Sequence, residues 1–247
     1  KAFFDGSLDP ERLLEAISLR TSTDAGESNV LVVLDEIQEC PEARTALKFF
    51  RIDGRYDVIG TGSLLGVKGY GKEPRSVPVG SETVIDMYPL DFEEFLWANR
   101  IADPVIDMLK KCLQKETPVP EALHNRMKQL LLQYVVVGGM PDAVQTFVDT
   151  KQMDEVLQIQ RDIVRSYEDD MVKYAEKKDK SRIKECFQSI PKQLSKENKK
   201  FQYSVVKKGS TASKYAGSLQ WIEDAGIIVR CYNLSITELP LDGNAEE

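Results

Sequence analysis

The sequence predicts an α/β domain built on a parallel sheet, followed by a helical region and a winged helix-turn-helix. Short, β-branched apolar runs alternate with helical patterns over the first hundred residues, which favours a parallel sheet. From Ile101 to about Lys178, apolar residues recur at helical spacing. Two short helical patterns, a longer one and an apolar run then follow in the order of a winged helix. We therefore expect the α/β domain at 1–100, the helical region at 101–178, and the winged helix with the start of a truncated further region at 179–247.

The alternating elements of the first part each have a local signal. Asp9 fits an N-cap and Pro10 the first position of a helix. The run "VLVVL" is continuous and β-branched, which is typical of a strand buried on both faces. A helix, "PEARTALKFF", separates it from a second strand, "YDVIGTGSLL", and "SETVIDMYPL" is predicted to be a third strand. The segment "DFEEFLWA" then opens a helix with the capping-box pair Asp91 and Glu94.

The later elements are predicted to be helical, with one sharp interruption. The helical stretches "LHNRMKQLLLQYVV" and "MDEVLQIQRDIVRSYEDDMVKYAE" are separated by "VGGMPDA", whose glycines and proline indicate a tight turn. The third helix of the winged region, roughly Thr211 to Ala225, should bury Tyr215, Leu219 and Ile222 on one face. Trp221 lies off that face, and we expect it to pack on a neighbouring domain.

Composition limits the class of protein. The chain has 247 residues, 42% hydrophobic and 30% charged, as in ordinary soluble globular proteins. No apolar run approaches the roughly 18 residues of a membrane span. The four cysteines are far apart and form no C-x-x-C pair, which argues for reduced thiols and against a disulfide framework or a zinc site. We therefore expect a cytoplasmic protein with no membrane segment.

Charge is distributed unevenly along the chain. The net charge is −7, yet the segment from Lys173 to Lys214 contains 13 Lys and Arg against 4 Asp and Glu, a net +9, and the remainder carries −16. A basic segment attracts nucleic-acid phosphates, although lysine-rich faces are also often simply solvated. The candidate nucleic-acid contacts are Lys199, Lys200, Lys207, Lys208 and Lys214.

The end of the first strand has the pattern of a Walker B motif. Asp35 and Glu36 follow the apolar run directly, and in P-loop ATPases an Asp at this position holds the Mg²⁺ that bridges the β- and γ-phosphates. The following Glu can act as general base toward the attacking water. The alternative is a pair of acids favoured by the N-terminus of the next helix. The second strand ends in "TGS", and Ser63 lies where AAA+ ATPases have a γ-phosphate sensor, unless it is an ordinary turn residue.

The phosphate-binding loop that such a motif requires has one literal match, "GVKGYGKE", from Gly66 to Glu73. We reject it because Glu73 has no hydroxyl for Mg²⁺ after Lys72, because turn residues rather than a helix follow, and because the loop comes after the acidic strand rather than before it. We expect the true loop to lie upstream of Lys1.

Together these segments resemble a family of AAA+-type predicted ATPases (AAA_14) that carry a C-terminal DUF4143 region. The resemblance rests on "FFDGSLDPERLLEAI", "LDEIQECPEARTALKFF", "YPLDFEEFLWA", "VVGGMPDAV", "IVRSYEDDMVKY" and "KYAGSLQWIEDAGII". It implies a P-loop NTPase (AAA+-like) core, a helical lid, a winged helix, and a nuclease-like region after Glu247. The chain departs from the family at Ser81 and at Ser210 to Ser213, where the family often has a basic residue.

The resemblance also implies roles for single residues. Asp35 would be the Mg²⁺-linked acid, Glu36 the catalytic base and Ser63 the sensor. Gly139 and Pro141 would lie near adenine, with an ordinary turn as the alternative. No arginine finger can be assigned among Arg55, Arg75 and Arg100.

Two functions from different classes follow. The first is a Mg²⁺- and ATP-dependent ATPase or nucleotide switch. The second is a winged-helix adaptor that binds nucleic acid or protein around a purely structural ATPase core.

Overall fold

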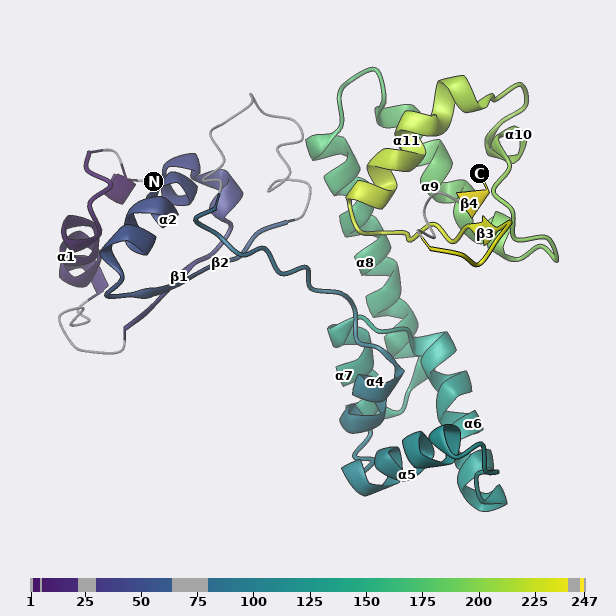
Figure 1. Cartoon of the computed structure of the whole chain (residues 1–247). Coiled ribbons are helices and arrows are strands. Elements are labelled where there is room, and N and C mark those ends of the chain that lie inside the picture. The colour runs from purple at the N-terminus through teal and green to yellow at the C-terminus, as the bar shows by residue number, and fades with distance from the viewer. Residues whose placement is uncertain (1, 5, 22–29, 64–79, 240–244, 247) are drawn as a thin grey trace. The chain divides into compact units, whose positions relative to one another are not determined.

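The structure is a computed structural model that describes residues 2–4, 6–21, 30–63, 80–239 and 245–246. Figure 1 shows the helices and strands of the chain, which divides into two compact units. One unit combines Lys1–Asp86 with Met171–Glu247, and the other is Met87–Asp170. Each unit is described by itself.

The first unit contains the predicted parallel strands. Its elements in this part are η1 (Ala2–Phe4), α1 (Pro10–Thr21), β1 (Leu31–Leu34), η2 (Ile37–Glu39), α2 (Pro41–Asp53) and β2 (Asp57–Gly60). The two strands run parallel, in a register that pairs Leu31 with Asp57 and Leu34 with Gly60. Helices α1 and α2 begin at the prolines that the sequence indicated. The strand–helix–strand order was therefore predicted correctly.

The expectation that the first strand is buried on both faces is wrong. Helices α1 and α2 and the strand share one core, made of Leu13, Leu14, Val32, Ala46 and Phe50. Since side chains alternate along a strand, burying Val32 leaves the flanking positions on the opposite face. Leu31 is 53% exposed and Val33 is 57% exposed. Within the described residues, helices cover only one face of this sheet.

The predicted third strand is also not formed. Residues 82–90 are extended but pair with no strand among the described residues, and the apolar side chains of Ile85, Met87 and Tyr88 are exposed. The segment is instead held near its two ends. Near its start, the guanidinium of Arg44 lies 2.6 Å from a carboxylate oxygen of Glu82. At its end, the backbone N–H of Leu90 donates a hydrogen bond to the carbonyl of Gly139 in the helical unit. High β-propensity does not make a strand without a partner.

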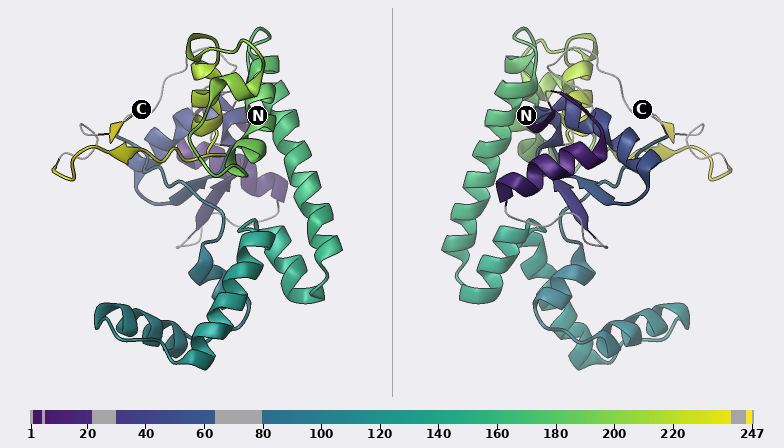
Figure 2. Two further views of the ribbon diagram at one scale, coloured as in Figure 1. Left: turned by 90° about the vertical axis from the view of Figure 1, so that its right-hand side faces the viewer. Right: turned by 90° about the vertical axis from the view of Figure 1, so that its left-hand side faces the viewer.

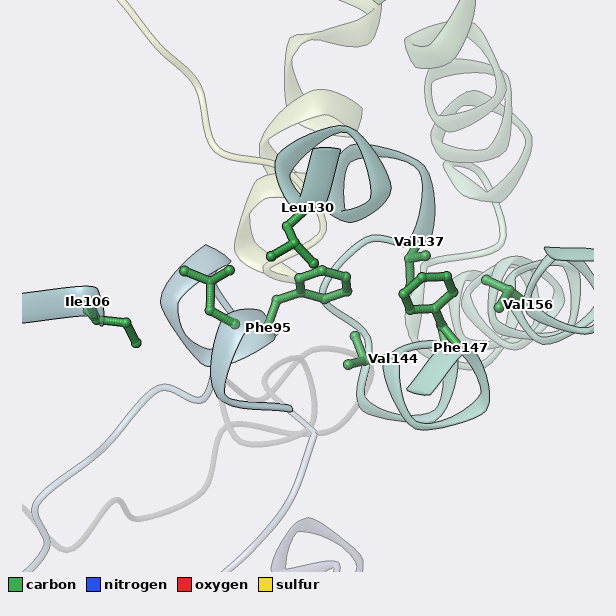
Figure 3. Packing of buried hydrophobic residues seen from close by; sticks show 9 residues of the cluster. Phe95, Ile106, Leu130, Val137, Val144, Phe147 and Val156 are labelled. Carbon is green, nitrogen blue, oxygen red and sulfur yellow. The ribbon is translucent and has the colours of Figure 1, made fainter. Parts of the chain in front are cut away.

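The helical unit, Met87–Asp170, consists of α4 (Phe92–Ala98), α5 (Asp103–Gln114), α6 (Glu121–Val137), α7 (Pro141–Thr150) and the first part of α8 (Met153–Tyr174). Helix α4 opens with the predicted capping box, in which Asp91 accepts a bond from the backbone of Glu94 and Glu94 accepts one from the backbone of Asp91. This helix belongs to the helical unit, although we had assigned its sequence to the α/β domain. The helices have a single core, in which Phe95 stacks on Phe147 with ring centroids 6.0 Å apart. Figure 3 shows these rings between Leu130 and Val156.

Helix α8 connects the two units. It is one unbroken helix of 22 residues in both views of Figure 2. Its residues up to Asp170 belong to the helical unit, and its last four, from Met171 to Tyr174, belong to the first unit.

The remainder of the first unit contains three helices followed by a small antiparallel pair. These elements are α9 (Lys180–Leu194), α10 (Tyr203–Val206), α11 (Ala212–Asp224), β3 (Asn233–Leu234) and β4 (Ala245–Glu246). Three helices follow one another as expected, but the first, with 15 residues, is longer than the third, with 13. The predicted apolar strand shrinks to the two residues of β3, so the described residues do not show the expected winged helix. Helix α11 buries Tyr215, Leu219 and Ile222 as predicted, and Trp221 as well. Trp221 is buried because Ser218, Trp221 and Ile222 continue the same face at i, i+3, i+4 spacing. Among the described residues, no helix has both the length and the apolar composition needed to cross a bilayer.

Candidate functional site

The carboxyl ends of β1 and β2 lie at the same edge of the sheet, since the strands are parallel. Asp35 follows β1 and Thr61 follows β2, and the Thr61 hydroxyl donates to the carboxylate of Asp35. The backbone joins the two ends as well: Thr61 N–H donates to Leu34 C=O, and Ile37 N–H donates to Thr61 C=O, both at 2.9 Å. The predicted meeting of the two strand ends is confirmed.

The carboxylates of Asp35 and Glu36 have different hydrogen-bonding partners, Thr61 for the first and Gln38 for the second. Its backbone is left-handed, with φ 51° and ψ 46°, a conformation that costs a non-glycine residue about 1 kcal/mol or more. The chain therefore turns sharply after Asp35, and the carboxylate of Glu36 accepts a hydrogen bond from the side-chain amide of Gln38. Asp35 and Glu36 are exposed, so both carboxylates are available to a ligand at this edge.

Ser63, two residues beyond Thr61, is joined to the end of α8. Its hydroxyl lies 3.4 Å from the hydroxyl of Tyr174, to which it donates. Tyr174 is only 5% exposed. Burial by itself raises the pKa of this phenol. The pKa is lowered by more than that through hydrogen bonds from Ser63, Lys173 and Gln38 and through the positive charge of Lys173, so it lies below its ordinary value. Two candidate residues, Ser63 and Glu36, are thus connected through Tyr174 and Gln38.

Lys173 adds a second contact from the same turn of α8. Its ammonium lies 3.3 Å from a carboxylate oxygen of Glu39 and 4.8 Å from the ring centroid of Tyr174. Hydrogen bonds to Tyr174 and to Glu39 raise the pKa of Lys173. The last turn of α8 is therefore bound to the η2 turn that directly follows the two acids.

The sheet edge suits a magnesium ion that is carried by a nucleotide. Among the described residues, no group of three or more His, Cys, Asp or Glu side chains could hold a metal by itself. Asp35 and Thr61 supply hard oxygen ligands, and Mg²⁺ is usually bound through one or two carboxylates plus phosphate oxygens and water. The donor set therefore fits Mg²⁺ bound together with a phosphate ligand and does not fit a self-contained metal centre.

The two adenine-side candidates, Gly139 and Pro141, lie in the helical unit between α6 and α7. Leu90 N–H donates to Gly139 C=O at 2.7 Å, and a Cβ on Gly139 would lie 2.1 Å from the carbonyl oxygen of Leu90. Gly138, at φ +77°, ends α6, and Pro141 begins α7. This geometry explains both candidates as parts of a tight turn, which was the alternative considered from the sequence.

The five candidate lysines of the basic segment are all exposed, but two of them are engaged within the chain. The ammonium of Lys207 lies 2.8 Å from the carboxylate of Glu185, and that of Lys199 donates to the carbonyl of Leu194 at the end of α9. Lys200, Lys208 and Lys214 have exposed side chains. The segment therefore presents a partly neutralised basic surface.

Of the remaining sequence candidates, Arg55 can be placed relative to the acidic edge. Arg55 is bound by Asp53 and precedes β2, so it lies at the amino end of that strand, opposite to Asp35. Arg100 follows α4 in the helical unit. The rejected loop from Gly66 to Glu73, and Arg75, lie outside the described residues.

Sequence reasoning missed three contributors to the edge. Tyr174 is 111 residues from Ser63, and nothing in the local pattern of α8 marks its hydroxyl. Gln38, buried at 7% exposure, looked like part of an ordinary turn. Gly60 had a detectable signal, since it is a glycine at the end of a strand: a Cβ there would lie 2.8 Å from Cδ1 of Ile37, so only glycine lets that turn pack against the strand.

Comparison with known families gives two matches. Residues 4–96, which include Asp35, Glu36 and Ser63, match the model of an AAA domain (AAA_14). Residues 128–243 match a domain of unknown function (DUF8612), whereas a DUF4143 region had been expected. No curated protein and no solved structure matches the chain. The first match supports an AAA-type ATPase-like domain with a P-loop NTPase-like fold and, at the level of the family, nucleotide binding.

Proposed function

We propose that this protein is a Mg²⁺- and ATP-dependent AAA-type ATPase or nucleotide switch that uses Asp35 and Glu36 as its acidic pair. One observation carries the proposal: within the residues that match an AAA domain, two neighbouring parallel strands end at one edge with Asp35 and Glu36 after one and Ser63 after the other. Ligands of open parallel sheets bind outside the carboxyl ends of the strands.

The three side chains have separate roles in this proposal. Asp35, fixed by the Thr61 hydroxyl, would hold Mg²⁺ directly or through water, and the ion when bound neutralises charge on the β- and γ-phosphates. Glu36 would accept the proton of the attacking water. Ser63 donates its hydroxyl proton to Tyr174 in the absence of ligand; with nucleotide bound it would turn this proton to a γ-phosphate oxygen and accept a hydrogen bond from the phenol instead. The left-handed backbone at Glu36 supports this division, because it separates the two carboxylates.

Affinity for the phosphates requires more than this edge. In P-loop proteins the backbone amides of the phosphate loop and its lysine supply most of it. Asp35 and Glu36 by themselves repel a nucleotide that carries no Mg²⁺. We therefore expect ATP binding to depend on a phosphate loop in addition to this edge, and the activity test uses the natural protein.

The test measures Mg²⁺-dependent ATP hydrolysis by the full-length protein and its variants. We expect Glu36→Gln to keep nucleotide binding and to slow hydrolysis by roughly 100-fold or more, the scale of losing a general base. Asp35→Asn should weaken the Mg²⁺-dependent binding itself. The matched control is Asp57→Asn, an exposed aspartate at the opposite, amino end of β2, which should leave both properties unchanged. Turnover that is unaffected by Glu36→Gln would exclude the proposed base.

The second candidate is a nucleic-acid adaptor, favoured by the net +9 between Lys173 and Lys214 and by the order α9, α10, α11, β3, β4. Salt-dependent DNA binding that Lys208→Glu and Lys214→Glu weaken, in a protein without ATP turnover, would favour this candidate over the first. DNA binding that is absent at low salt excludes it. The ion pair between Lys207 and Glu185 reduces the positive charge that this surface can use.

A further inference from the structure

The phenol of Tyr174 joins the two connections that carry the candidate catalytic groups. Its hydrogen-bonding partners include Ser63, after β2, at 3.4 Å, and Gln38, in the turn after β1. Gln38 in turn donates to the carboxylate of Glu36. A continuous chain of hydrogen bonds therefore runs from Glu36 through Gln38 and Tyr174 to Ser63.

This chain does more than satisfy a buried hydroxyl. A buried tyrosine needs one partner for its hydroxyl, and any nearby carbonyl would serve that purpose. Here two of the partners, Gln38 and Ser63, lie in the separate connections that follow β1 and β2. Both connections belong to the edge at which a nucleotide would bind. Gln38 and Tyr174 are both buried, at 7% and 5% exposure, so water does not compete with their bonds, and a side-chain network of this kind restricts the rotamers of its members.

The anchoring of Tyr174 is also stronger than a single bond would give. The preceding residue, Lys173, lies 3.3 Å from Glu39, at the end of the η2 turn that contains Gln38. Two consecutive residues of α8 therefore contact the connections at the sheet edge. Both residues belong to the last turn of a helix, so the phenol is positioned by helical backbone and not by a loop.

We propose that Tyr174 is a positioning residue of the ATPase site, which holds Ser63 directly and Glu36 through Gln38 in the orientations needed for hydrolysis. This proposal rests on the proposed function. Tyr174 touches no reacting atom in it. Losing its hydroxyl should therefore leave nucleotide affinity nearly intact and lower the rate of the chemical step, because misplacing a catalytic group reduces kcat.

The experiment compares the wild-type full-length protein with Tyr174→Phe, Ser63→Ala and the double variant in Mg²⁺-dependent ATP hydrolysis. Loss of one positioning hydrogen bond corresponds to roughly a 3- to 10-fold fall in kcat, with KM for ATP changed by less than about 2-fold. Part of the effect of Tyr174→Phe acts through Ser63, and that part is already lost in Ser63→Ala. The double variant should therefore have a higher kcat than the product of the two single effects predicts. The control Tyr215→Phe removes another buried phenolic hydroxyl, bonded to Glu185 in the α9–α11 region, and should leave kcat unchanged.

A second readout needs no nucleotide. In the ligand-free protein, hydrogen exchange should become faster in Tyr174→Phe for peptides that cover 36–39 and 61–63, while peptides of α1 keep their wild-type rates. A merely structural role would speed exchange throughout the first unit. If Tyr174→Phe does not fold, Gln38→Met, which removes the amide at similar volume, takes its place and should lower kcat in the same range.

The outcomes separate the two proposals. If the wild-type protein shows no Mg²⁺-dependent ATP hydrolysis, the proposed function is refuted, and the positioning role of Tyr174 is refuted with it. An active wild type in which Tyr174→Phe, or Gln38→Met in its place, keeps kcat within about 2-fold overturns the positioning role alone. Fully multiplicative effects of Tyr174→Phe and Ser63→Ala would do the same.

Discussion

Replacing Gly139 with alanine tests whether the glycine turn serves folding or nucleotide binding. A Cβ at this position would lie 2.1 Å from the carbonyl oxygen of Leu90, 3.0 Å from its nitrogen and 3.1 Å from its carbonyl carbon. These atoms are backbone, so no side-chain rotation can relieve the overlap. The two segments must therefore separate by about 1 Å, a change of the scale that over-packing produces.

The cost has two parts. Separation breaks or weakens the hydrogen bond from Leu90 N–H to Gly139 C=O, now 2.7 Å long, which is worth about 1 kcal/mol. Over-packing adds about 1–3 kcal/mol. We expect Gly139→Ala to destabilise the helical unit by about 2–4 kcal/mol, which in a domain of this size lowers Tm by about 10–30 °C.

The assay is urea unfolding of the whole chain, followed by hydrogen-exchange mass spectrometry of peptides from 87–170. The control is Gly217→Ala, in the interior of α11, where a Cβ would meet nothing within 4 Å. In a helix interior this change should stabilise by about 0.5–1 kcal/mol. The reasoning is refuted if Gly139→Ala leaves the helical unit within about 0.5 kcal/mol of wild type. Weaker nucleotide binding at unchanged stability would instead support the adenine-side role.

Two further predictions concern a helix cap and a pH-dependent ion pair. Asp91→Ala removes the acceptor that caps α4 and should lower the free energy of unfolding of the helical unit by about 1 kcal/mol. Hydrogen exchange of peptides from 87–170 measures this change, and wild-type exchange rates would show that the cap contributes nothing. Lys207 and Tyr215 lower the pKa of Glu185 below its ordinary 4.5, so the bonds of this carboxylate stabilise the fold above that value and are lost as pH falls through the lowered pKa. Glu185→Gln should therefore destabilise the α9–α11 region by about 1 kcal/mol near neutral pH. The loss should become progressively smaller as the pH falls below 4.5, as followed by urea unfolding over that range; a loss that stays constant with pH would contradict the assignment.

The sequence alone determined the local elements and the location of the acidic edge. Periodicity, proline at the first helical position and the capping box at Asp91 are short-range signals, and they correctly predicted α1, α2, α4, α6, α8 and α11. The pairing of two strand ends followed as well. A helix between two strands is the usual connection of a parallel pair, and parallel pairing brings Asp35 and Thr61 together.

Tertiary structure decided which faces are covered and which distant side chains meet. The same apolar pattern can belong to a strand buried on one or both faces, because burial depends on what packs against it, and Val33 is exposed for this reason. The segment 82–90 has the residues of a strand but lacks a partner among the described residues. The bond between Ser63 and Tyr174 spans 111 residues, and only the path of α8 brings those hydroxyls together. Local propensity is set by neighbours in the chain, whereas burial and long-range hydrogen bonds are set by neighbours in space, so the sequence could indicate the acids of the site but not the tyrosine that connects them.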